Sequence, residues 1–202
     1  MKARQLSRND LEGARAEVYH MILFAMAWVM IGEYSLHFRD YVLAAFLVVT
    51  AAVILGLQSN KLYEMEDELP EVGSGPGSDA LKRKKRSQLY VGIFLFEGVA
   101  IMATWMILLR LGHEDWLVAA FALVAGLHFI PLARVTRIGS YYVLAAWLCA
   151  LAGIGYWLLL SGMLTATGSN VLIAYGCAAG AIADGALIVV GTRRAFGRTA
   201  RK

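Results

Sequence analysis

The chain has 202 residues and a net charge of +4, and 59% of its residues are hydrophobic while 17% are charged. Soluble domains average about 45–50% apolar and about 25% charged residues, so this composition excludes an ordinary soluble domain and a disordered chain. The mean hydropathy is +0.59, and the apolar residues fall in long runs. Because about 20 such residues cross the hydrocarbon core of a bilayer as one helix, the sequence predicts an all-α, polytopic membrane protein.

Six apolar segments follow one another along the chain, and they predict a single transmembrane domain, a bundle of six transmembrane helices. The predicted spans are residues 18–36, 41–57, 89–111, 116–133, 142–161 and 171–190. The second span is barely long enough to cross, and the helix that carries the first is expected to begin near Asn9 or Asp10. All connections except the one between the second and third spans are short, so neighbouring helices are expected to run antiparallel.

The longest connection, residues 58–88, combines acidic residues, a Gly-Ser-Gly-Pro-Gly segment and a basic run. This composition predicts a flexible, charged cytoplasmic loop. The loop separates a unit of two helices from a unit of four.

The distribution of Lys and Arg predicts the orientation of the six spans. With the N-terminus inside, 17 of the 19 Lys and Arg residues lie on the cytoplasmic side, and the opposite orientation would invert this bias. We therefore predict that both termini are cytoplasmic (N-in/C-in). The basic run of residues 82–86 is then assigned to anionic lipid head groups at the membrane surface, and no nucleic-acid partner is predicted.

Five ionisable residues lie inside the predicted spans: His20, Glu33, Glu97, His128 and Asp184. Each costs about 2.5–3.5 kcal/mol to insert at the centre of a helix, so each requires a partner or a function. At about 1.5 Å per residue, Glu97, His128 and Asp184 lie roughly 8–12 Å below the cytoplasmic boundary. His20 is slightly shallower, whereas Glu33 is near the outer end. The similar depth of these four residues, Glu97, His128, Asp184 and His20, predicts a shared polar pocket that opens toward the cytoplasm.

Two carboxylates and two imidazoles in one pocket are compatible with three interpretations. They could pair across helices for purely structural reasons, form a proton or solute pathway, or carry metal or hydrolytic chemistry. No two of these residues have a spacing that places two metal ligands on one helix face, so no metal and no cofactor are predicted.

Two further features concern helix packing. Gly176, Gly180 and Asp184 recur every four residues, which predicts a face of small residues for close helix approach, with Asp184 pointing into the bundle. Such a face also makes a homodimer plausible. Pro131 cannot donate a backbone hydrogen bond, which predicts a kink or break in the fourth span near His128.

Residues 126–134, GLHFIPLAR, resemble a string in small uncharacterised bacterial integral membrane proteins. The resemblance covers about ten residues and implies a multi-pass protein of the bacterial inner membrane. It implies no chemistry, because no activity is established for such proteins.

The sequence contains no recognisable catalytic pattern. Ser161 is followed by no histidine, which excludes an intramembrane Ser–His pair in that order, and no Walker A loop or dinucleotide fingerprint is present. Cys149 and Cys177 lie within apolar runs and are predicted to be packing residues. An enzyme is therefore the less favoured class.

The favoured interpretation is a small transport-like or channel-like protein with a cytoplasm-facing polar pocket. In it, Glu97 and Asp184 bind a proton or cation, His128 relays or gates, and His20 lines the rim. The alternative is a non-catalytic membrane scaffold or accessory subunit that binds a partner through its charged cytoplasmic loop and tails.

Overall fold

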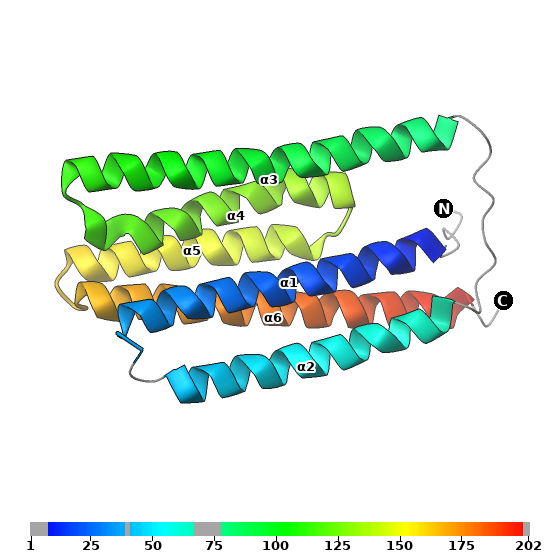
Figure 1. Cartoon of the computed structure of the whole chain (residues 1–202), viewed down its shortest axis with the longest axis horizontal. Coiled ribbons are helices and arrows are strands. Elements are labelled where there is room, and N and C mark those ends of the chain that lie inside the picture. Colours follow the sequence, from blue (N-terminus) through cyan, green and yellow to red (C-terminus); the bar gives the residue numbers. More distant parts are fainter. Residues whose placement is uncertain (1–7, 39–40, 67–77, 200–202) are drawn as a thin grey trace.

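A computed structural model describes residues 8–38, 41–66 and 78–199 (Figure 1). Within these ranges the chain forms six α-helices and one short 3-10 helix, with no strand. The helices are α1 (Arg8–Ser35), α2 (Tyr41–Glu66), α3 (Ser78–Leu111), α4 (Leu117–Thr136), α5 (Ser140–Leu160) and α6 (Ala166–Thr199), and the 3-10 helix η1 (Glu114–Trp116) precedes α4.

Five of the described helices are long and apolar enough to cross a membrane, as expected of a multi-pass membrane protein. Their apolar parts are Leu11–Ser35, Ser87–Leu111, Glu114–Thr136, Ser140–Leu160 and Ala166–Gly197. The exception is α2, whose described apolar part, Phe46–Lys61, is shorter. The predicted all-helical fold is thus confirmed.

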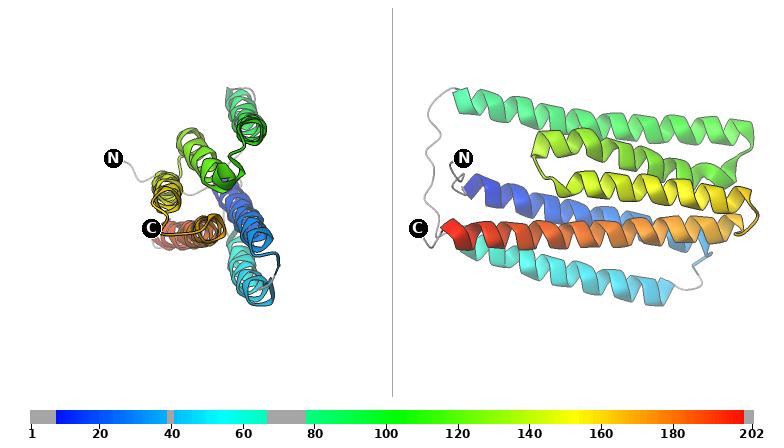
Figure 2. Two further views of the ribbon diagram at one scale, coloured as in Figure 1. Left: turned by 90° about the vertical axis from the view of Figure 1, so that its left-hand side faces the viewer. Right: turned by 180° about the vertical axis from the view of Figure 1, so that it is seen from behind.

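The six helices lie along one common direction, and successive helices run in opposite directions (Figure 1). The most extensive interface joins α1 to α6, and α5 packs between α4 and α6. The end-on view in Figure 2 places α2 and α3 at opposite edges of the bundle. Of these two, α3 packs mainly against α4, and none of its apolar window is buried inside the protein.

The helices extend further toward one end of the bundle than the apolar segments predicted. Residues 58–66 belong to α2 and residues 78–88 to α3, so most of the predicted flexible loop is helical, and residues 67–77 lie outside the described residues. The loop prediction was therefore too long. The physical reason is that Glu, Lys, Arg and Leu are good helix formers, and adding a turn to an existing helix avoids the cost of nucleation.

Close packing of α5 against α6 depends on the two glycines that the sequence singled out. A Cβ atom at Gly180 would lie 2.6 Å from Trp147 Cδ1, and one at Gly176 would lie 2.7 Å from Leu151 Cδ1. The indole Nε1 of Trp147 also donates a hydrogen bond of 2.9 Å to the Gly176 carbonyl oxygen. The face of small residues is therefore packed against α5 of the same chain.

The helix α4 continues through Pro131 to Thr136, so the proline does not break it. Pro131 lies in the second-last turn of α4 and lines the groove between α3 and α4 that is described next.

Candidate functional site: a groove between α3 and α4

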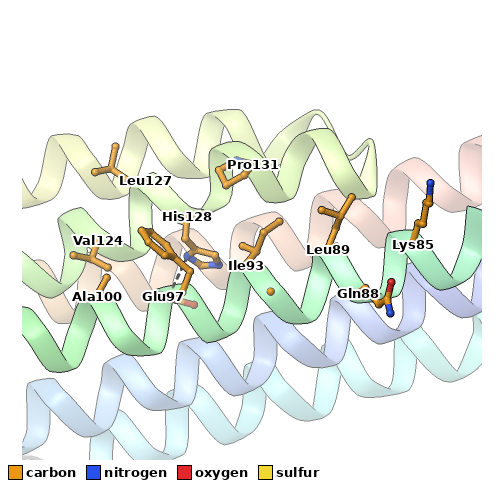
Figure 3. Close-up of a pocket in the computed structure, with 12 residues that line it drawn as sticks. Lys85, Gln88, Leu89, Ile93, Glu97, Ala100, Val124, Leu127, His128 and Pro131 are labelled. Atoms are coloured by element: carbon orange, nitrogen blue, oxygen red, sulfur yellow. Dashed lines mark ion pairs between the residues drawn. The ribbon is translucent and has the colours of Figure 1, made fainter.

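A groove of about 730 Å³ lies between α3 and α4, along one side of the pair (Figure 3). Its lining residues recur every three or four positions on each helix, which places them on one face of each. They are Lys85, Gln88, Leu89, Gly92, Ile93, Phe96, Glu97 and Ala100 on α3, and Val124, Leu127, His128 and Pro131 on α4. Most are apolar, with Lys85 and Gln88 at one end and Glu97 and His128 deep inside.

The groove brings together two of the four predicted site residues, Glu97 and His128. The Nδ1 atom of His128 lies 3.0 Å from Glu97 Oε1 and 2.7 Å from the Ala125 carbonyl oxygen. Both neighbours are hydrogen-bond acceptors, so Nδ1 must carry the ring hydrogen. The other ring nitrogen, Nε2, is then the acceptor of the neutral imidazole. This nitrogen is buried and has no hydrogen-bond partner among the described residues.

His20 of α1 lies close to this pair but is separated from it by two phenyl rings. Its ring centroid is 4.8 Å from that of Phe94 and 6.4 Å from that of Phe129. The same two rings contact His128, at 5.6 Å and 4.3 Å. His20 therefore does not line the groove, and its nearest charged neighbour is Glu17, whose Oε2 lies 3.7 Å from Nδ1.

Glu17 is a buried carboxylate that sequence reasoning missed. It is 7% exposed, accepts a hydrogen bond from the Tyr141 hydroxyl of α5 and also interacts with Tyr90 of α3. It was missed because it lies one residue outside the predicted first span, residues 18–36. Its spacing of three residues from His20 was a signal available in the sequence, since residues three apart share a helix face.

Asp184 does not line the groove between α3 and α4. It is 3% exposed and lines a second, smaller pocket of about 370 Å³ between α5 and α6, together with Ser140, Trp147 and Gly180 among others. It interacts with the hydroxyl of Ser140, and its Oδ2 atom has no hydrogen-bond partner among the described residues.

The four residues predicted to lie at a similar depth thus do not share one cavity: Glu97 and His128 line the groove, whereas Asp184 lines another pocket. Asp184 faces α5 because Gly176 and Gly180, on the same stripe of α6, allow α5 to approach closely. Glu97 lies on α3, at the far edge of the bundle beyond α4 (Figure 2). The depth predicted along the membrane normal does not determine which neighbouring helix a residue faces, so it predicted neither of these positions.

Glu33 is held at the opposite end of α1 from Glu17. It is 3% exposed and accepts a hydrogen bond from the Tyr175 hydroxyl of α6. A Cβ atom at the neighbouring Gly32 would be 3.2 Å from the Tyr175 ring, so the glycine allows the close approach. Glu33 therefore links α1 to α6 outside the groove.

Within the described parts of the chain, no three His, Cys, Asp or Glu side chains are grouped closely enough to hold a metal ion. What the groove offers chemically is a carboxylate–imidazole pair with one unoccupied acceptor nitrogen, surrounded by apolar side chains. Comparisons of the chain with known protein families, with curated proteins and with solved structures found no match.

Proposed function

We propose that this chain is a small transport-like protein of the bacterial inner membrane, in which the Glu97–His128 pair binds and releases a proton during the movement of a cation or small solute. One observation carries this proposal. A buried imidazole and a partly buried carboxylate, 3.0 Å apart, line an apolar groove instead of being enclosed between packed helices. A pair that only joins two helices gains nothing from an adjacent open volume, whereas a binding site requires one.

The proposed topology has six spans with both termini in the cytoplasm. Its support is that α1 begins, and α6 ends, at the end of the bundle that carries the α4–α5 turn (Figure 1). Arg137 follows α4 in that turn, and the exposed Lys85 lies in the first turns of α3. Basic residues gather on the cytoplasmic side of membrane proteins. The proposal requires α2 to cross as well, although its described apolar part, Phe46–Lys61, is shorter than those of the other five helices.

The chemistry of the pair suits proton transfer. Histidine is the side chain whose protonation changes near neutral pH, and a neighbouring carboxylate can share or receive its proton. Because Nδ1 is held by two acceptors, a proton that arrives from the groove binds at Nε2 of His128 or at the Glu97 carboxylate.

Reconstitution into liposomes that contain a pH-sensitive dye tests the proposal. A pH gradient is imposed and its decay is followed without added solute, with Na⁺ or K⁺, and with a lipophilic cation. We expect the wild-type protein to accelerate the decay under at least one condition, and Glu97→Gln and His128→Gln to reduce the protein-dependent rate at least tenfold.

Glu33→Gln is the matched control, since it removes a buried, hydrogen-bonded carboxylate that does not line the groove. We expect it to retain the wild-type rate. Wild-type protein that accelerates the decay under none of the conditions overturns the proposal, as does equal activity of Glu97→Gln and the control.

A further inference from the structure

We propose that the groove between α3 and α4 binds a monovalent lipophilic cation, which reaches it from the lipid and displaces one proton from the Glu97–His128 pair. This inference rests on the proposed function and names the class of solute that the proton is exchanged for. It is carried by the direction in which the groove opens, by the charge balance at its base and by the side chains of its walls.

The groove lies on the side of the α3–α4 pair that is turned away from α1. Phe94 of α3 points toward α1, with its ring 4.8 Å from that of His20, and Tyr90 interacts with Glu17 of α1. Neither Phe94 nor Tyr90 lines the groove. Since α3 lies at the edge of the bundle (Figure 2), the opposite side of α3 faces the lipid.

The lining residues themselves are consistent with access from the bilayer. Phe96 is 73% exposed and Leu89 is 59% exposed, although both belong to the apolar part of a membrane-spanning helix. A solute that enters between such side chains has to be soluble in the hydrocarbon region. The size of the groove, about 730 Å³, is within the range of about 300–1,000 Å³ that is typical of small-molecule sites.

Charge balance at the Glu97–His128 pair determines the charge of this solute. With Nδ1 already protonated, the pair has a net charge of −1 when it holds no further proton, and it is neutral when Nε2 of His128 or the Glu97 carboxylate binds one. A net charge in apolar surroundings is costly, so either a proton or a monovalent cation at the pair is favoured, and the proposal is that the two alternate. A bound monovalent cation replaces the charge of the proton, and the proton leaves to water. The exchange is one proton for one cation, with no covalent bond made or broken.

The walls of the groove favour a cation over an anion at its base. The phenyl ring of Phe96 lines the groove in the same turn of α3 as Glu97, and an aromatic face attracts a cation. The basic residue of the lining, Lys85, is about 18 Å from Glu97 along the helix at 1.5 Å per residue. It lies at the end of the groove that the proposed topology places at the cytoplasmic surface, where basic residues are favoured. An anion would pair with Lys85 at that end of the groove and not with the Glu97–His128 pair.

The test uses the purified full-length protein in uncharged detergent micelles and two probes of the same shape and opposite charge. Tetraphenylphosphonium is the cation, and tetraphenylborate is the anion. Titration calorimetry in two buffers with different ionisation enthalpies gives the binding constant and the number of protons released. We expect tetraphenylphosphonium to bind with release of about one proton, and its apparent Kd to rise toward tenfold per unit fall in pH. Saturable binding of tetraphenylborate in the groove, or cation binding without proton release, overturns the proposal.

Two glycine substitutions on α3 show whether the binding occurs in the groove. A Cβ atom at Gly92 or at Gly98 would meet no other heavy atom within 4 Å, so both positions accept a side chain. Gly92 lines the groove and Gly98 does not. We expect Gly92→Trp to weaken tetraphenylphosphonium binding at least tenfold, Gly98→Trp to change it less than twofold, and Glu97→Gln to abolish the proton release. Equal effects of the two tryptophan variants would refute the assignment.

The outcome also separates this inference from the proposed function. If the cation does not bind while proteoliposomes still show proton movement with another solute, only the identity of the solute is wrong. If the cation binds with proton release and no proton movement occurs across the membrane, the groove is a binding site without transport, and the proposed function fails.

Discussion

Replacing Tyr141 by Phe removes a single hydroxyl group from the centre of the bundle. That hydroxyl donates a hydrogen bond to Glu17 and thereby joins α5 to α1. Tyr141 is fully buried and Glu17 is 7% exposed, so water does not readily replace the lost donor. The phenyl ring remains, and with it the contact to Phe129 at a centroid distance of 5.3 Å. The variant therefore isolates the hydrogen bond from the packing.

The expected cost follows from the chemistry of the pair and from its surroundings. A hydrogen bond to a charged group contributes about 1.5–3 kcal/mol in water-soluble proteins, whereas double-mutant cycles in a membrane protein average about 0.6 and reach about 1.7 kcal/mol. Burial of both partners places this bond in the upper part of the membrane range. Tyr90 still interacts with Glu17 in the variant, which limits the loss. We expect Tyr141→Phe to lower the free energy of unfolding by about 1.5 kcal/mol, roughly a tenfold change in the folding equilibrium.

Reversible unfolding in mixed micelles of dodecyl sulfate and dodecyl maltoside, followed by tryptophan fluorescence, measures this effect. A double-mutant cycle with Glu17→Gln gives the coupling energy of the pair. Tyr142→Phe is the control, because this neighbouring side chain is 46% exposed and its hydroxyl is expected to contribute little. A coupling energy within about 0.3 kcal/mol of zero, below the usual error of such cycles, would refute the reasoning that this bond fastens α5 to α1.

Three further predictions concern packing, protonation and topology. Gly180→Ala is expected to destabilise the protein by about 1–3 kcal/mol through overpacking against α5, while Gly153→Ala, whose Cβ atom meets nothing within 4 Å, is expected to leave unfolding in mixed micelles unchanged or slightly favour the folded state. Nitrogen NMR of labelled histidine is expected to show His128 protonated at Nδ1, and an Nε2–H tautomer would contradict the geometry of the groove. A cysteine at His113 is expected to react with an impermeant maleimide in intact cells, and one at Lys61 only after permeabilisation; labelling of both from one side would exclude the six-span topology.

The sequence was sufficient to predict the helices because a helix lets the backbone N–H and C=O groups of each apolar run hydrogen-bond to one another in lipid. The ends of the helices were less predictable. Residues 58–66 and 78–88 continue α2 and α3 as polar helix, since the apolar signal stops at the membrane surface while helix propensity does not.

For the site, topology predicted depth but not lateral neighbours. Glu97 and His128 meet because α3 and α4 are joined by a short connection and pack as an antiparallel pair. Asp184 does not join them, since the close approach of α5 at Gly180 turns that stripe of α6 toward α5. Such contacts depend on which glycine faces which helix, and periodicity alone does not determine this. Glu17 was missed because it lies at the boundary of its span, where a charge is ordinary.

The extensive interface between α1 and α6 has a consequence for biosynthesis, because α1 leaves the ribosome long before α6. Until α6 is made, Glu33 lacks the hydroxyl of Tyr175, and Glu17 waits for Tyr141 on α5. Until α5 and α6 are made, α1 therefore carries two carboxylates that lack these two donors, although Tyr90 of α3 reaches Glu17 earlier. Association of inserted helices can follow their insertion as a separate stage, and here it must. A chain that stops before α6 still contains Tyr141 for Glu17 but leaves Glu33 without the Tyr175 hydroxyl, so the α1–α6 interface forms only when α6 is present.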